Sequence, residues 1–409
     1  MKLRLTGNAK PMRPFWHTGT FWAFALGLFL NAYVYGIAAM ALLRSALFGS
    51  LATLGMAWAP AGFLVGIVAG GVAADRYGRR IILAWGPLGY VTGLLGLLWA
   101  GGPSMVLASS LVLLVTAGVE SNTILTYSQE LLPLATRRRA MYAELNFVNL
   151  GGLALAAVAL AGHRSGPPLH ELLSLVPVGM ALLSWPLRTR LSESRLWRES
   201  RLRTRQTLPH DYRLRFAVAA AFSFSNTAGF SLLAYAFGHE FLPDHFHHLL
   251  FVSTLSAFLA GLLARWFGRL SPKFLLLLGY GMASLSAFLI LQIQTPHRPE
   301  FWAALLVLSA FTSLSYLAED TFKSDLWPSA VRARVIAAVR AIGMAGYLGL
   351  LLWEQRAPLS HFVPVMVGTW GLGFIAAVVW WLAGRPTFQH DRPVSENRLT
   401  HRSRHNKLR

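Results

Sequence analysis

Long stretches of the chain carry no charged side chain. Residues 14–43, 45–74 and 81–119 contain no Asp, Glu, Lys or Arg. A helix needs about 20 apolar residues to cross the roughly 30 Å hydrocarbon core of a bilayer. Each of the first two runs therefore predicts one membrane span, and the third predicts two spans joined by the A-G-G-P-S turn at residues 100–104. The pattern indicates an all-α polytopic membrane protein.

The same reasoning applied to the whole chain, with breaks at Gly, Pro and charge clusters, predicts twelve spans. They are residues 16–42, 52–74, 80–99, 105–128, 140–162, 170–188, 214–238, 247–267, 273–293, 300–320, 333–353 and 361–383. The predicted segments are a six-helix bundle at 1–188, a basic linker at 189–213, a second six-helix bundle at 214–384 and a basic tail at 385–409. Both an amphipathic helix on the membrane surface and a solvated linker fit the polar segment.

Composition and charge agree with a membrane protein. Hydrophobic residues make up 55% of the chain and charged residues 13%, whereas soluble proteins carry about 25% charged residues. The net charge of +20 would also fit a nucleic-acid-binding protein, but 32 of the 37 basic residues fall in alternate loops and the two tails. By the positive-inside rule, the N-terminus, the linker and the C-terminus are expected in the cytoplasm, next to anionic lipid, and no nucleic acid is needed as a partner. Arg greatly outnumbers Lys, which favours a GC-rich bacterial genome and hence a bacterial inner membrane.

Two motif pairs recur in the two halves of the chain. One pair repeats at an offset of 190 residues: Gly71, Asp75, Gly78 and Arg79 match Gly261, Arg265, Gly268 and Arg269. The other repeats at an offset of 195 residues: Glu130, Pro133 and Arg137 match Asp325, Pro328 and Arg332. Two independent pairs at nearly equal offset predict two six-helix halves related by an axis along the membrane normal.

These residues carry a family resemblance. The segment G-G-V-A-A-D-R-Y-G-R-R at 70–80 resembles the signature loop between the second and third helices of the major facilitator superfamily. The segment at 118–137 resembles the metabolite:proton symporter and sugar porter branches, with sialic acid and organic-acid carriers as the nearest match. The resemblance implies a secondary transporter that works by alternating access, with a cavity lined by the first, fourth, seventh and tenth helices.

The motifs predict a charged gate on the cytoplasmic side. Small glycines permit a tight turn between helices, and Asp75 can accept hydrogen bonds at a helix start. The arginines of the loop are expected to reach Glu130 and to break that contact when the protein opens inward. The proposed gate residues are Gly71, Asp75, Arg76, Gly78, Arg79, Arg80, Glu130, Pro133, Arg137, Asp325, Pro328 and Arg332. The alternative is that the arginines only orient the chain; in the second half Arg265 replaces the acid, so a weaker gate is expected there.

Two charged residues inside predicted spans are candidates for function, because burying a charge in a bilayer is costly. Glu120 lies about 15 Å along its helix from Glu130, near the middle of the membrane, on one stripe with Thr123 and Tyr127. We expect that stripe to face the central cavity, and Glu120 is the proton-coupling candidate. Arg340, about 12 Å into its span, is expected to bind an anionic substrate or to pair with Glu319 or Asp320.

Polar residues in the spans complete the candidate substrate site. They are Asn31, Tyr35, Tyr127, Asn226 and Tyr316, together with Arg340. Each one could instead bond a neighbouring helix. The histidine-rich turn at 239–248 could form a metal site or a pH sensor, but its irregular spacing favours a neutral external loop, and no metal is predicted.

The sequence predicts a monomeric secondary active transporter, without a cofactor, for a small polar metabolite of the organic acid, sialic acid or sugar type. Proton coupling is expected, although residues 14–74 lack the acid that many proton-coupled sugar porters carry. A proton-independent facilitator, a drug or metabolite exporter and, more distantly, a transporter-like solute receptor remain as alternatives. An enzyme is disfavoured because there is no cysteine, no H-E-x-x-H and no G-x-S-x-G, and an ATP-driven pump because there is no phosphate-binding loop.

Overall fold

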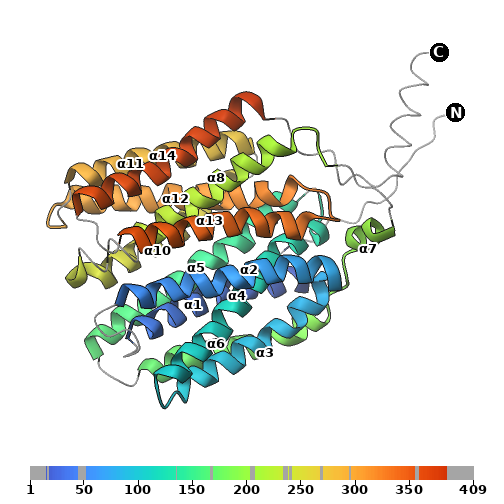
Figure 1. Ribbon diagram of the computed structural model, residues 1–409, viewed down its shortest axis with the longest axis horizontal. Helices are drawn as coiled ribbons and strands as arrows, with labels where there is room; N and C mark the ends of the chain where they lie inside the picture. The colour runs from blue at the N-terminus through green and yellow to red at the C-terminus, as the bar shows by residue number, and fades with distance from the viewer. Residues whose placement is uncertain are drawn as a thin grey trace.

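The computed structural model describes residues 15, 18–44, 52–134, 136–165, 169–202, 208–233, 238, 242–267, 270–293, 296–354 and 359–384. Within this part of the chain nearly all residues are helical and none is in a strand. The helices form two groups, one below the other in Figure 1.

The lower group, which we call the N-half, contains α1 (Gly19–Arg44), α2 (Ala52–Tyr77), α3 (Arg79–Leu98), α4 (Pro103–Leu131), α5 (Arg137–Ser165) and α6 (Leu169–Thr189). The upper group, the C-half, contains α8 (Tyr212–Ser231), the short 3₁₀ turn η3 (Pro243–His245), α10 (Phe246–Phe267), α11 (Pro272–Ile293), α12 (Pro299–Asp325), α13 (Arg332–Glu354) and α14 (Leu359–Ala383). The short helix α7 (Arg195–Leu202) lies at one end of the bundle, which we call the basic end because the loops there carry most of the basic residues.

The apolar runs form helices that turn many large side chains outward. Leu183, Trp85 and Val65 are among the exposed hydrophobic side chains, as expected for helices that face lipid. Among the described residues, ten helices are long and apolar enough to cross a membrane. The remaining two long helices, α8 and the described part of α6, fall short of that measure. In α8 the cause is two arginines near its start and a polar stretch at residues 223–227.

The prediction of an all-α polytopic protein in two helical bundles is confirmed, while the residue boundaries of the domains stay a prediction. Several helix ends differ by a few residues from their expected positions, and one of these differences changes the site. We expected the tenth span to end at residue 320, but α12 continues to Asp325. Lys323 therefore lies inside a helix and is buried, instead of lying in a loop.

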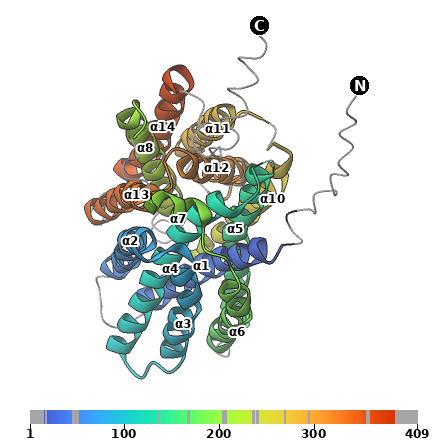
Figure 2. The same cartoon turned by 90° about the vertical axis from the view of Figure 1, so that its right-hand side faces the viewer.

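The two halves meet along two pairs of helices, α2 against α13 and α5 against α10, as the end-on view in Figure 2 shows. The first contact depends on Gly71. A Cβ atom at this position would lie 2.3 Å from the Cβ of Ala337 in α13, so only glycine allows the two helices to approach this closely.

The polar segment between the halves does not behave as a solvated linker in its described part. Trp197 of α7 is only 9% exposed, and its indole nitrogen donates a hydrogen bond to the Asp75 carbonyl oxygen at 3.2 Å. Arg79 and Arg201 lie over the faces of the same indole ring, at 5.6 and 5.2 Å from its centroid. Helix α7 is therefore docked on the basic end of the protein.

Candidate functional site

A network of charges, buried except for Arg334, joins the two halves at the basic end. Arg79 of α3 lies 3.0 Å from Asp75 and 3.2 Å from Glu130, measured between its Nη2 atom and their carboxylate oxygens. The same Glu130 oxygen lies 3.2 Å from Nη1 of Arg332, which belongs to the C-half. Asp75 also accepts hydrogen bonds from the backbone nitrogen and Nε of Arg334. We call these five residues the gate network.

Further hydrogen bonds close the same end, beside the ion pairs of the gate network. Gln129 donates to Asp325 at 2.7 Å, and Asn122 donates to the Ala333 carbonyl oxygen at 3.1 Å. Arg79 donates to the Ser329 carbonyl oxygen at 2.9 Å. Each of these hydrogen bonds runs from the N-half to the C-half, so the structure has the basic end closed.

The signature loop is held by a residue that the sequence reasoning missed. Gly78 has a φ of 105°, which favours glycine, and it lets the chain turn from α2 directly into α3. The Glu193 carboxylate accepts hydrogen bonds from the backbone nitrogens of Arg79 and Arg80, at 3.2 and 3.1 Å, and so caps the start of α3. In the sequence, Glu193 is visible only as an acid near the start of a basic segment, and this does not indicate that it binds the start of α3.

The other motif residues hold the turns of the two halves. Arg137 donates from Nε to the Leu132 carbonyl oxygen at 3.1 Å, and Arg332 donates in the same way to Trp327 at 3.1 Å. These two pairs are related by the offset of 195 residues, and Pro133 and Pro328 lie in the turns that they span. Arg80 donates to the Thr189 carbonyl oxygen, and Arg76 lies over the ring of Tyr77. Gly268, Arg269 and the side chain of Arg265 lie outside the described residues.

Replacing Gly71 with Leu should keep the basic end from closing. The new side chain would overlap Ala337, and an overpacked contact costs about 1–3 kcal/mol, which lowers the ratio of closed to open protein by roughly five- to a hundredfold. Because the chain has no native cysteine, spin labels can be placed at Tyr77 and Leu270, which are exposed near the basic end in opposite halves. Double electron–electron resonance should report longer distances in the variant.

The control for this experiment is Gly349→Leu. A Cβ atom on Gly349 of α13 would meet nothing within 4 Å, so the added side chain has space. Equal distance distributions in the two variants would contradict a role for the α2–α13 contact in closure.

Two adjoining cavities lie between the halves. The smaller one, of about 200 Å³, is lined mainly by α8 and α12, and the larger one, of about 240 Å³, by α1, α4, α5, α10 and α13. Tyr316, Asp320 and Arg340 line both cavities. Of the other candidate substrate residues, Asn226 lines the smaller cavity, and Asn31 and Tyr35 line the larger one.

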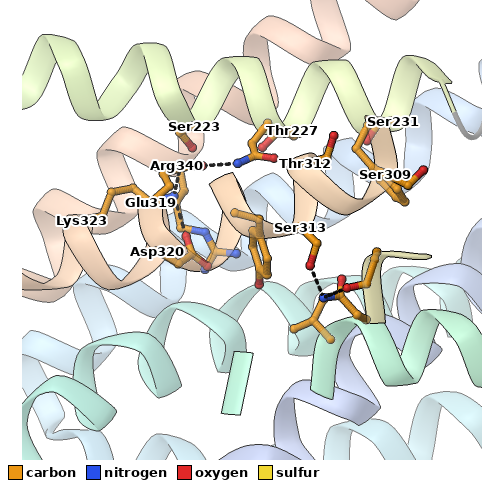
Figure 3. A pocket seen from close by; sticks show the side chains of 16 residues that line it. Ser223, Thr227, Ser231, Ser309, Thr312, Ser313, Glu319, Asp320, Lys323 and Arg340 are labelled. Carbon is orange, nitrogen blue, oxygen red and sulfur yellow. Dashed lines mark hydrogen bonds and ion pairs between the residues drawn. The ribbon is translucent and has the colours of Figure 1, made fainter. Parts of the chain in front are cut away.

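Three charged residues form a buried cluster on the wall of the smaller cavity (Figure 3). Nζ of Lys323 lies 2.6 Å from Glu319 and 2.7 Å from Asp320, both on the same helix α12. We call these three residues the α12 cluster. Glu319 also accepts a hydrogen bond from Asn226 at 2.6 Å and one from the Tyr280 hydroxyl at 3.0 Å. The two carboxylates therefore share one lysine.

Arg340 reaches the same cavities from α13. Its Nη1 donates to the Ser121 hydroxyl at 3.1 Å, and its guanidinium lies 6.0 Å from the ring centroid of Phe63. The sequence leaves open whether Arg340 pairs with Glu319 or Asp320. The structure brings all three side chains together, but the ion pairs of the two acids are with Lys323.

Glu120 does not lie where we expected it. Its two carboxylate oxygens accept hydrogen bonds from both terminal nitrogens of Arg188, at 2.7 and 2.8 Å, and neither side chain is more than 1% exposed. The pair lies inside the N-half, between α4 and α6, and lines neither cavity. The expectation that the Glu120 stripe faces the central cavity was wrong, because Arg188 at the end of α6 turns inward and binds the carboxylate.

Tyr127 belongs to the same buried region. Its hydroxyl donates to the Ser192 carbonyl oxygen, its ring packs against Phe24, and it lines neither cavity. The sequence reasoning also missed two cations that lie buried within helices. Arg188 and Lys323 are both buried within helices, and both lay at or beyond predicted span ends.

The histidine-rich turn is described only in part, since residues 239–241 lie outside the described residues. The rings of His245 and His297 meet edge to face, 5.9 Å apart. Within the described part of the chain, no group of three or more His, Asp or Glu side chains is arranged to hold a metal ion.

Comparison of the sequence with family models and with curated proteins finds no match. The fold does match solved structures. The proton:xylose symporter XylE bound to 6-bromo-6-deoxy-D-glucose has a TM-score of 0.75 at 18% identity, over 90% of this chain and 95% of that chain. The human organic anion transporter MFSD10 has a TM-score of 0.70 at 14% identity, over 88% and 99%.

A third similar structure is inward-open XylE from E. coli, with a TM-score of 0.66 at 15% identity, over 91% of this chain and 97% of that chain. With two helical bundles, the gate network between them and these neighbours, the protein is a multi-pass membrane protein with the fold of the major facilitator superfamily.

Proposed function

We propose that the protein is a secondary transporter that moves a small organic anion across the membrane by alternating access. Cavities between two halves, closed at one end by a network of charges, are the arrangement that this mechanism requires. The basic end would face the cytoplasm of a bacterial inner membrane, in contact with anionic lipid. The structure would then correspond to a state closed toward the cytoplasm, and the chain would act as a monomer.

The observation that carries the proposal is the position of Arg340. Placing a cationic side chain within the membrane core costs several kcal/mol, so such a side chain is retained where it has a function. The two acids beside it are bound to Lys323, and its own hydrogen bond goes to a neutral hydroxyl. Guanidinium binds a carboxylate through two parallel hydrogen bonds, and it stays charged at all physiological pH values. These features support an organic acid as the substrate.

A neutral sugar is the second candidate. XylE is named as a proton:xylose symporter, and the cavities also offer the uncharged donors and acceptors that hydroxyl groups need, on Asn31, Tyr35, Asn226 and Tyr316. In that case Arg340 would have a structural role. Proton coupling is part of the proposal, and a proton-independent facilitator or an exporter is the alternative.

Thermal stabilisation of the purified protein separates these substrates. The panel contains N-acetylneuraminate, L-malate, pyruvate, benzoate and D-xylose. A ligand at 100 times its dissociation constant adds about 2.7 kcal/mol to the free energy of unfolding. We expect at least one acid to raise the melting temperature and D-xylose to have no effect.

Arg340→Gln should abolish the stabilisation by the acid, and Arg340→Lys should retain part of it, because lysine keeps the charge but not the paired geometry. Arg195→Gln is the control, since Arg195 is 85% exposed at the basic end, outside both cavities. A shift with D-xylose alone, unchanged in Arg340→Gln, would instead support the sugar transporter.

A further inference from the structure

The α12 cluster carries an inference that rests on the proposed function and extends it to the coupling ion. We propose that Asp320 carries the transported proton, and that the proton and a substrate anion on Arg340 bind together. Glu120, the candidate expected from the sequence, then has no part in coupling.

Glu319 is surrounded by hydrogen-bond donors. It receives the Lys323 ammonium at 2.6 Å, the Asn226 amide at 2.6 Å and the Tyr280 hydroxyl at 3.0 Å. These partners come from α12, α8 and α11, so the carboxylate is surrounded by donors on three helices. Hydrogen bonds to an ionised carboxylate favour its charged form.

Asp320 has a different environment. Its ion pair is to the same lysine, at 2.7 Å, and it lies against the Tyr316 hydroxyl. Unlike Glu319, it borders both cavities, and Arg340 from α13 borders the same two. The charged and titratable groups around it are therefore Glu319, Lys323, Tyr316 and Arg340, with Tyr280 behind Glu319.

Counting these charges gives the reason for coupling. Glu319 and Asp320 share Lys323, so the two acids are balanced only when Arg340 is counted with Lys323, and of the two acids it is Asp320 that borders both cavities beside Arg340. An anion bound to Arg340 would bring a second negative charge into the space that Asp320 already borders. Two like charges close together in a partly desolvated cavity repel each other far more strongly than they do in water. A proton on Asp320 removes this repulsion, so anion and proton favour each other's binding.

The Glu120–Arg188 pair lacks these properties. It is balanced one to one with two hydrogen bonds, and Gly27 and Gly86 leave just enough room for it. It borders neither cavity, so a substrate would not change its surroundings. This makes Glu120→Gln, made together with Arg188→Met so that no charge is left buried alone, the matched control for Asp320→Asn.

The first test needs no substrate. Infrared difference spectra of the protein in liposomes, between about pH 8 and about pH 5, should show a protonated carboxyl band in the wild type. We expect Asp320→Asn to lose this band and Glu120→Gln/Arg188→Met to keep it. If Asp320→Asn does not fold, Asp320→Glu should shift the band instead. Absence of a titrating band in the wild type, or a band that only Glu120→Gln/Arg188→Met removes, overturns the proposal.

The second test uses the acids of the panel as probes. With one proton bound per anion, the affinity of the wild type for N-acetylneuraminate, L-malate, pyruvate or benzoate should rise about tenfold per unit fall in pH, above the range in which Asp320 titrates. Asp320→Asn should bind with an affinity that no longer depends on pH, and Glu120→Gln/Arg188→Met should keep the dependence. A pH dependence that survives in Asp320→Asn overturns the proposal.

The two tests separate this inference from the proposed function. If no acid in the panel binds, the organic-anion proposal fails, while the infrared experiment still decides whether Asp320 titrates. If an acid binds but Asp320 does not titrate, the substrate class stands and the coupling residue is wrong.

Discussion

Glu130→Gln should open the basic end of the protein. One oxygen of the Glu130 carboxylate lies 3.2 Å from both Arg79 and Arg332, and all three side chains are at most 1% exposed. Removing one partner from a buried ion pair costs about 3–5 kcal/mol, because the remaining charge stays desolvated. In the open state these arginines regain water, so the variant favours that state.

This effect is large enough to reverse the equilibrium between the closed and open states of the basic end. A change of about 5.5 kcal/mol moves a two-state equilibrium from 99:1 to 1:99, and the expected cost is more than half of that. Distances between spin labels at Tyr77 and Leu270 should therefore shift from mostly short to mostly long. The measurement is independent of the substrate.

The control is Glu199→Gln. Glu199 pairs with Arg195 at 2.6 Å in α7, also at the basic end, but both side chains are exposed, and such pairs contribute about 0–1 kcal/mol. Unchanged distances in Glu130→Gln would mean that the motif arginines only orient the chain in the membrane.

The parts of the site that the sequence could predict are those in which each motif determines its own local geometry. The glycine at 78 is required by a positive φ angle. The glycine at 71 is required instead by the approach of α13, which the sequence did not indicate. The repeat at an offset of 195 residues corresponds to two equivalent turns, in which Arg137 and Arg332 bond the carbonyl oxygen five residues before them. In these two turns, the residue types and their short spacing along the chain were sufficient to indicate equivalent structures.

The parts that were missed depend on contacts between helices that are distant in the sequence. Arg188 is the last residue of the predicted span 170–188, and nothing near it in the sequence indicates that it binds Glu120, 68 residues earlier. Lys323 lies beyond the predicted span end at residue 320, whereas α12 continues past it and its ammonium pairs with both Glu319 and Asp320. Hydropathy counts each charge separately, so it does not detect charges that are buried as pairs.

Arg188→Met should destabilise the protein strongly. The substitution leaves the Glu120 carboxylate buried and without its cation, at a cost of about 3–5 kcal/mol. The double variant Glu120→Gln/Arg188→Met removes both charges, and replacing a buried pair by uncharged residues is often neutral. We expect a large fall in melting temperature for the single variant and recovery of most of it in the double variant.

The double variant also decides between two roles for the pair. A pair that only ties α4 to α6 can lose both charges without affecting substrate binding, so the affinity of the double variant for an acid of the panel should keep its dependence on pH. If that dependence disappears while the protein remains stable, the proton is carried by Glu120 and the assignment to Asp320 is wrong. Stability and pH dependence therefore have to be measured on the same variant, because a pair buried outside both cavities is expected to change the first and not the second.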